Sequence, residues 1–214
     1  GFKDKHAVIF AGHGNNGGDG FVLAKHCNEV CQTLVLFLGH EHKLSKEAQK
    51  HYDNIKDLVP IINIINEEDF ANFKFQKGKD LIIFDAMIGT GITGKIKEPI
   101  ASAVDFFNKT IASKIAVDVP TGIHPDTGDI QDKHCECDLI VTFHDIKNGL
   151  EKYKDKIVVV DIGLNGLEEK QLEEDYDDDD NGDNDSVSTK TQNESENKSS
   201  DIKITDTTIP EKKD

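Results

Sequence analysis

The sequence contains no arginine, no tryptophan and no long apolar run, and it has only four cysteines. All 25 basic residues are lysine, against 41 acidic residues, which gives a formal net charge of -16. Such a charge repels phosphate backbones, so we expect no nucleic-acid partner. Without an apolar run of about 20 residues, we expect no membrane span. Four cysteines are too few for a disulfide framework in a chain of 214 residues, which favours an intracellular protein.

The acidic residues are concentrated near the carboxyl terminus. Residues 169–214 hold 16 acidic and 6 basic residues and hardly any apolar ones. Such a segment cannot bury enough apolar surface to offset the entropy of ordering it. We therefore predict an acidic disordered tail over residues 169–214. Residues 1–168, with 25 acidic and 19 basic residues, are predicted to form one domain.

Short apolar runs alternate with helical patterns through this domain. The helical patterns cover residues 21–30, 46–58 and 96–107. Continuous apolar runs bounded by glycine or polar residues predict buried parallel strands, and their alternation with helices predicts an α/β fold. We expect a doubly wound, mostly parallel sheet with helices on both faces. The expected strands are Ala7–Phe10, Thr33–Leu38, Ile61–Ile65, Leu81–Phe84, Lys114–Val117, Leu139–Phe143 and Ile157–Val160.

Three polar, glycine-rich segments follow three of these strands. They are GHGNNGGDG at residues 12–20, DAMIGTGITGK at 85–95 and DVPTGIHPDTG at 118–128. Ligands of open α/β sheets bind beyond the carboxyl ends of the strands. The three segments are therefore predicted to converge on one crevice.

The first segment permits two interpretations. Gly12, Gly14 and Gly17 satisfy the spacing of a dinucleotide fingerprint, and Glu41 stands near the end of the second strand, where a ribose-binding acid belongs. Asp19 argues against a classical dehydrogenase, because a carboxylate at the start of a helix repels a pyrophosphate. Asp19 is alternatively a simple helix cap.

The other two segments carry groups suited to an anion and a cation. Glycine backbone amides with Thr90, Thr93 and Lys95 can bind an anionic ligand. Oxygen atoms of Asp85, Asp118, Thr121 and Asn16 suit a hard cation rather than zinc. The alternative for both segments is structural, with glycine turns and aspartates that cap them.

Taken together, these segments resemble the NAD(P)H-hydrate epimerase family, known as the YjeF N-terminal domain. Its patterns GxGNNGGDG, DAxxGTG and VDxP(S/T)GxxxxTG match at residues 12–20, 85–91 and 117–128, and TFxxxKxGL matches at 142–150. The resemblance implies a Rossmann-like fold and interconversion of the R and S forms of hydrated NADH and NADPH. It covers residues 5–165 or so, and a helical segment that precedes the first strand in the family is expected to be missing here.

The resemblance also implies roles for individual residues. Asp118 is the implied catalytic residue at the reactive nicotinamide ring. One K⁺ ion per subunit is implied at Asn16, Asp85 and Thr121. The implied substrate contacts are Asn15, Asn16, Gly17, Gly18, Asp19, Gly89, Thr90, Gly91, Ile92, Thr93, Gly94, Lys95 and Asp118.

The expected partners and setting follow from the same resemblance. We expect a homodimer that works with a dehydratase on a separate chain, in the cytoplasm, or in mitochondria if a targeting segment was removed. A non-enzymatic ligand-binding or dimerisation scaffold and an NAD-dependent oxidoreductase are the alternatives. The residues do not distinguish hydrated NADH from hydrated NADPH, because lysine can replace the missing arginine at a 2′-phosphate.

Overall fold

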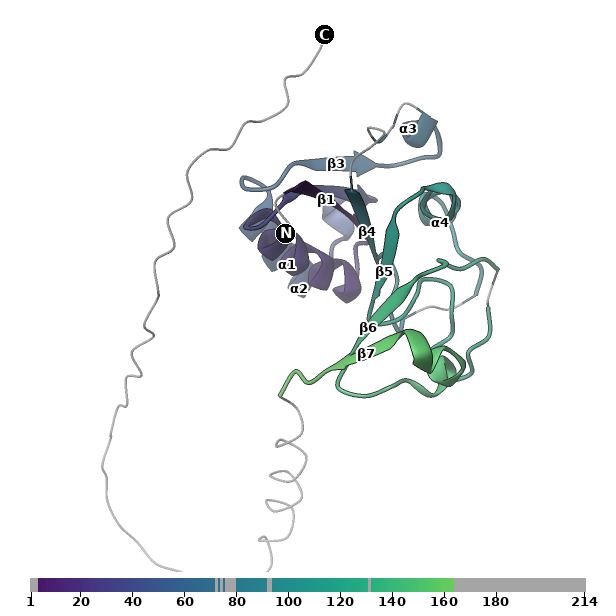
Figure 1. Cartoon of the computed structure of the whole chain (residues 1–214). Helices are drawn as coiled ribbons and strands as arrows, with labels where there is room; N and C mark the ends of the chain where they lie inside the picture. The colour runs from purple at the N-terminus through teal and green to yellow at the C-terminus, as the bar shows by residue number, and fades with distance from the viewer. Residues whose placement is uncertain are drawn as a thin grey trace, which may run out of the picture. The chain divides into compact units, whose positions relative to one another are not determined.

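The computed structural model describes residues 4–71, 73, 75, 80–91, 94–130 and 132–163, all within one compact unit. Seven parallel strands form one sheet in the order β3-β2-β1-β4-β5-β6-β7 (Figure 1). The predicted α/β fold is confirmed, and the sheet is wholly parallel. The strands are β1 (Lys5–Ala11), β2 (Gln32–Leu38), β3 (Ile61–Ile64), β4 (Asp80–Ala86), β5 (Ser113–Val117), β6 (Leu139–Phe143) and β7 (Ile157–Val160).

Helices cover both faces of the sheet, as the alternation of strands and helices predicts. Helices α1 and α2 pack on one face and α4 packs on the other (Figure 1). Successive residues of a strand point to opposite faces of the sheet. Ile9 therefore packs in the core beneath α1 and α2, and Phe10 packs in the core beneath α4. The helical elements are α1 (Asn15–Asn28), η2 (Glu41–Lys43), α2 (Lys46–Ile55), α3 (Glu68–Ala71), α4 (Ile100–Lys109) and η3 (Asn148–Lys156).

The chain reverses direction across the sheet between β1 and β4. After β1 the chain runs outward through β2 to β3, and after β4 it runs the other way to β7. Such a switch point leaves a crevice at the carboxyl ends of the two central strands. The glycine-rich segments that follow β1, β4 and β5 lie at that edge.

The first helix begins six residues earlier than the sequence predicts. The pattern places its start at Phe21, but α1 begins at Asn15 and includes most of the glycine-rich segment. The prediction fails because glycine has a low helix propensity, so a glycine-rich segment is predicted to be a loop. Tertiary packing overrides that propensity. A side chain on Gly17 would collide with the Gly12 carbonyl oxygen, and Gly18 lies against the backbone of Ala48 on α2.

Gly17→Ala should therefore destabilise the fold by more than about 2 kcal/mol. The added Cβ would lie 1.9 Å from the Gly12 oxygen, so the start of α1 would have to shift. Urea unfolding measures the change. Gly91→Ala is the matched control, because nothing lies within 4 Å of its Cβ position, and it should change stability by less than about 0.5 kcal/mol. An equal effect of the two substitutions would contradict this account.

Two other predictions need comment. The helix predicted over residues 96–107 is α4, which begins at Ile100 after a cis bond between Glu98 and Pro99. The acidic tail predicted over residues 169–214 lies outside the described residues. Within the described part of the chain, no helix has the length and apolarity needed to cross a bilayer.

Candidate functional site

The ends of β1, β4 and β5 meet at the switch point, as the sequence predicts. The Gly12 amide donates to the Ala86 carbonyl at 3.1 Å and so joins the ends of β1 and β4. A side chain on Gly89 would contact Asn16, so the segment after β4 lies over the start of α1. Hydrogen bonds between Asp85 and Thr121 join the segments that follow β4 and β5. The predicted convergence is confirmed.

Asn16 is a buried side chain with unused polar atoms. Only 8% of the residue is exposed, and neither its amide oxygen nor its amide nitrogen has a hydrogen-bond partner among the described residues. An unpaired buried amide costs about 1–3 kcal/mol, so such a group in a crevice indicates a position that binds a ligand. Its neighbour Asn15 differs, because its amide oxygen accepts a hydrogen bond from the Ser45 hydroxyl at 2.8 Å.

Asp85 is fully buried at the end of β4. One carboxylate oxygen accepts from the Thr121 amide at 2.7 Å. The other accepts from the Thr121 hydroxyl at 2.7 Å and from the Met87 amide at 3.2 Å. Burial raises the pKa of Asp85 although these hydrogen bonds oppose the rise. A cation beside the carboxylate would offset the cost of burying its charge.

Asp118 follows β5 in a left-handed backbone conformation, with a φ of 65°. Its carboxylate accepts from the Lys147 ammonium at 2.6 Å and more weakly from the Thr142 hydroxyl at 3.3 Å. Lys147 is itself fixed, because it also donates to the Thr142 hydroxyl at 3.1 Å and to the Phe143 carbonyl at 2.8 Å. This network sets the direction of the Asp118 carboxylate. A non-glycine residue with positive φ is strained, and such strain is concentrated at functional sites.

Lys147 is the functional residue that sequence reasoning missed. It is part of the TFxxxKxGL pattern, but a lysine at that spacing has no evident partner in the sequence. The fold supplies the partner, because the pairing of β5 with β6 brings the ends of these strands together. The family pattern was the only signal that could have singled it out.

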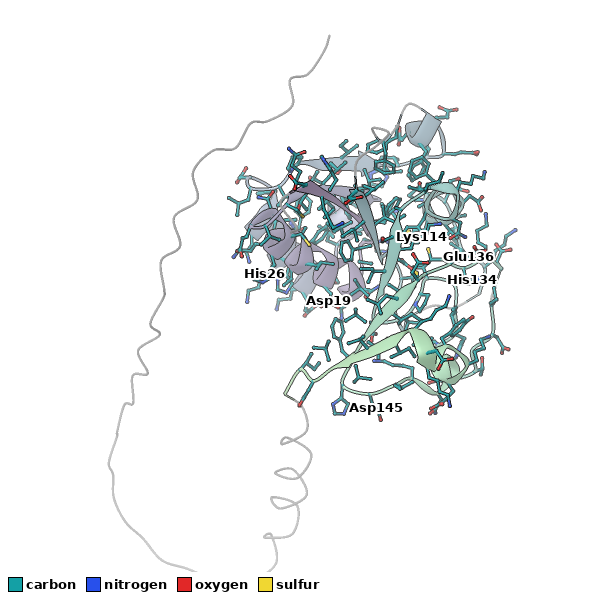
Figure 2. All side chains as sticks on the ribbon, in the orientation of Figure 1. Asp19, His26, Lys114, His134, Glu136 and Asp145 are labelled. Carbon is teal, nitrogen blue, oxygen red and sulfur yellow. The ribbon has the colours of Figure 1, made fainter. Side chains whose placement is uncertain are left out.

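Asp19 brings a second carboxyl group towards Asp118. Asp19 lies on α1 (Figure 2), beyond the first turn, so it is not the N-terminal cap, which is Gly14. Desolvation raises the pKa of Asp19, the negative charge of Asp118 raises it further, and His51 lowers it. Two carboxyl groups in unlike environments can divide proton donation and acceptance between them.

The segment after β4 contributes the remaining predicted contacts. Gly89 lies against Asn16, whereas Gly91 and Gly94 line a pocket beside the site, and Gly94 has a φ of 69°. Lys95 lines the same pocket, which has a volume of about 420 Å³. The predicted contacts Ile92 and Thr93 lie outside the described residues. The predicted substrate contacts that the structure describes all lie on the segments that follow β1, β4 and β5.

Comparison with known proteins agrees with this geometry. Residues 1–149 match the family model described as the YjeF-related protein N-terminus. The chain belongs to this family. It is 40% identical over 152 residues to an NAD(P)H-hydrate epimerase of Nitrosopumilus maritimus, covering 71% of this chain and 69% of that protein. The solved structures include a crystal structure of the yeast protein ynu0, with a TM-score of 0.62 and 26% identity, covering 74% of this chain and 66% of that one.

Other family relatives are larger. A bifunctional NAD(P)H-hydrate repair enzyme of Methanothermobacter thermautotrophicus is 37% identical over 164 residues, which are 73% of this chain and 32% of that enzyme. The chain thus spans about two thirds of the single-activity epimerase and about one third of the bifunctional enzyme.

Proposed function

We propose that this protein is an NAD(P)H-hydrate epimerase, an isomerase that interconverts the R and S forms of hydrated NADH and NADPH. The observation that carries the proposal is the carboxylate of Asp118, fixed by Lys147 at the switch point of a YjeF-type domain. The names of the relatives support the same activity. A pure scaffold has no chemical need for this strained, ion-paired acid beside a second carboxyl group.

The reaction requires inversion at C6 of the hydrated nicotinamide ring. The C6–oxygen bond breaks as the leaving hydroxyl takes up a proton and departs as water, and the ring nitrogen stabilises the resulting cation. Water then adds to the other face of C6 and gives up a proton. Asp118 in its protonated form would donate the first proton, and the carboxylate so formed would stabilise the cation. The same carboxylate would accept the second proton, which restores the acid for the next turnover.

Two neighbours support Asp118 in this role. Lys147 is a positioning residue, because it fixes the Asp118 carboxylate while bonded to the backbone of β6. Asp19 is the second carboxyl group near the site, and desolvation and the charge of Asp118 raise its pKa, which favours its protonated form.

Asn16, Asp85 and Thr121 would hold the K⁺ ion that the family resemblance implies. Their fit rests on two observations, the unpaired amide of Asn16 and the fully buried carboxylate of Asp85. Carboxylate, amide and hydroxyl oxygens are ligands that hard cations prefer. When bound, the ion would supply a positive charge that offsets Asp85 and fixes the three segments relative to one another.

The assembly state is also part of the proposal. On β7, at the edge of the sheet, Val158, Val159 and Val160 are 47%, 44% and 39% exposed, and Ile162 beyond the strand is 53% exposed. Apolar side chains gathered in this way support a homodimer. The bifunctional relatives support a dehydratase as the functional partner.

Epimerisation of R-form hydrated NADH tests the proposed function. The full chain should convert it to the S form well above the spontaneous rate, followed over time by chromatography that resolves the two epimers. Conversion should be faster in KCl than in choline chloride. If the protein adds nothing to the spontaneous rate in either salt, the scaffold interpretation replaces the enzyme.

A further inference from the structure

A pocket of about 420 Å³ lies beside the site, at the carboxyl ends of β1 and β2. Its floor is apolar and includes Leu38, Ile88 and Ile96. Pockets for nucleotides and other small molecules have volumes of about 300–1,000 Å³ and combine apolar walls with a few polar groups. The volume and the floor of this pocket suit an adenosine group.

The rim of the pocket is positively charged, in a chain whose net charge is -16. In the described part of the structure, its lysines form no ion pair with any carboxylate. The one acidic residue among the described lining residues is Glu98, and its carboxylate accepts the Ser102 amide at 3.2 Å. Unpaired cations around an apolar floor favour an anionic ligand. The cations of the rim are Lys43, Lys95 and Lys97.

The position of the pocket indicates which anionic group it would bind. In dinucleotide-binding α/β folds, an acid at the end of the second strand binds the free 2′-hydroxyl of the adenosine ribose, and a cation there accommodates a 2′-phosphate. Glu41 is the acid at that place, but it is engaged elsewhere, because its carboxylate accepts the Tyr52 hydroxyl at 2.6 Å. Lys43 and His40, from the same segment, line the pocket instead.

The segment that carries Lys43 is fixed against the start of α1. The Ser45 amide donates to the His13 carbonyl at 2.9 Å, and the Ser45 hydroxyl donates to the Asn15 side chain at 2.8 Å. The same hydroxyl caps α2 by accepting the Ala48 amide at 3.2 Å. Asp19 lies beyond the first turn of α1, so no carboxylate of that turn opposes a pyrophosphate at the amino-terminal end of the helix. The pocket and this end of α1 are thus held as one unit.

We propose that this pocket binds the adenosine end of the substrate with its 2′-phosphate, so that the enzyme prefers hydrated NADPH to hydrated NADH. The inference rests on the proposed function and names its preferred substrate. Lys43 is the residue that determines this specificity, with Lys95 and Lys97 completing the charge around the phosphate.

Kinetics with both substrates test the preference. The wild-type kcat/KM should be about tenfold higher for hydrated NADPH, and Lys43→Gln should lower that ratio by about tenfold, because one charged hydrogen bond is lost. Lys50→Gln is the matched control, since Lys50 is an exposed lysine on α2 outside the pocket and should leave the ratio unchanged. A wild-type ratio near one, or a ratio that Lys43→Gln does not alter, overturns the inference.

Binding of the oxidised dinucleotides separates this inference from the proposed function. Isothermal titration should show NADP⁺ binding about tenfold more tightly than NAD⁺, with the difference lost in Lys43→Gln and kept in Lys50→Gln. If neither hydrated substrate is epimerised but this difference is found, the proposed function fails and the pocket assignment stands. Equal affinities, or no binding of either dinucleotide, overturn the pocket assignment.

Discussion

Asp118→Asn should lower kcat for epimerisation by about 10²- to 10⁴-fold, the usual contribution of a positioned acid or base. The amide cannot donate a carboxylic proton, cannot accept one from water, and carries no charge to stabilise the ring cation. The substitution suits the test, because asparagine tolerates the left-handed backbone that Asp118 adopts. Initial rates with R-form hydrated NADH and NADPH, resolved by chromatography, give the measurement.

Asp57→Asn is the control for this experiment. Asp57 is an exposed aspartate beyond the end of α2, away from the site, so its loss should leave the rate unchanged. Thermal unfolding of both variants shows whether the fold is intact. An Asp118→Asn protein that is folded and turns over at the wild-type rate would show that Asp118 is not the catalytic residue.

K⁺ should raise the unfolding temperature by roughly 5 °C at a pH where Asp85 is ionised in the folded protein, and by less as the pH is lowered. Burial raises the pKa of Asp85, so the folded state favours its neutral form. The stability contributed by that neutral form is present at low pH and is lost as the pH rises through the raised pKa. A cation at Asn16, Asp85 and Thr121 would compensate the negative charge of ionised Asp85. K⁺ should therefore stabilise the folded protein more strongly as the pH rises. Differential scanning fluorimetry in KCl and in choline chloride measures the difference.

Asp85→Asn provides the matched control for the K⁺ prediction. The amide has nearly the same shape as the carboxylate but carries no charge to bury. Both the loss of stability with rising pH and its recovery by K⁺ should shrink in this variant. If K⁺ stabilises Asp85→Asn as much as the wild type, the ion acts somewhere other than this site.

The sheet was the most predictable part of the molecule. Each predicted strand is present within a few residues, because continuous apolar runs such as Leu139–Phe143 are typical of buried parallel strands. The meeting of the three glycine-rich segments was predictable for the same reason, since parallel strands end at a common edge. Asp85 and Thr121 are joined there by hydrogen bonds, as that reasoning requires.

The parts that sequence reasoning missed depend on contacts between distant segments. The start of α1 was placed too late because Gly17 is helical only through its packing against Gly12. Lys147 could not be paired with Asp118, 29 residues away, before the order of β5 and β6 was known. Glu41 was expected to bind ribose, and only the fold shows that the Tyr52 hydroxyl engages it. Local patterns contain none of this information.

The glycine-rich start of α1 depends on the rest of the domain for its helical conformation. Three glycines, Gly17, Gly18 and Gly20, each cost a helix about 1 kcal/mol relative to alanine, so this half of α1 does not form on its own. It becomes helical only when the sheet edge and α2 are already in place. The stretch proposed to meet the substrate therefore takes its shape from the rest of the domain. A short peptide with this sequence would have no recognition ability of its own.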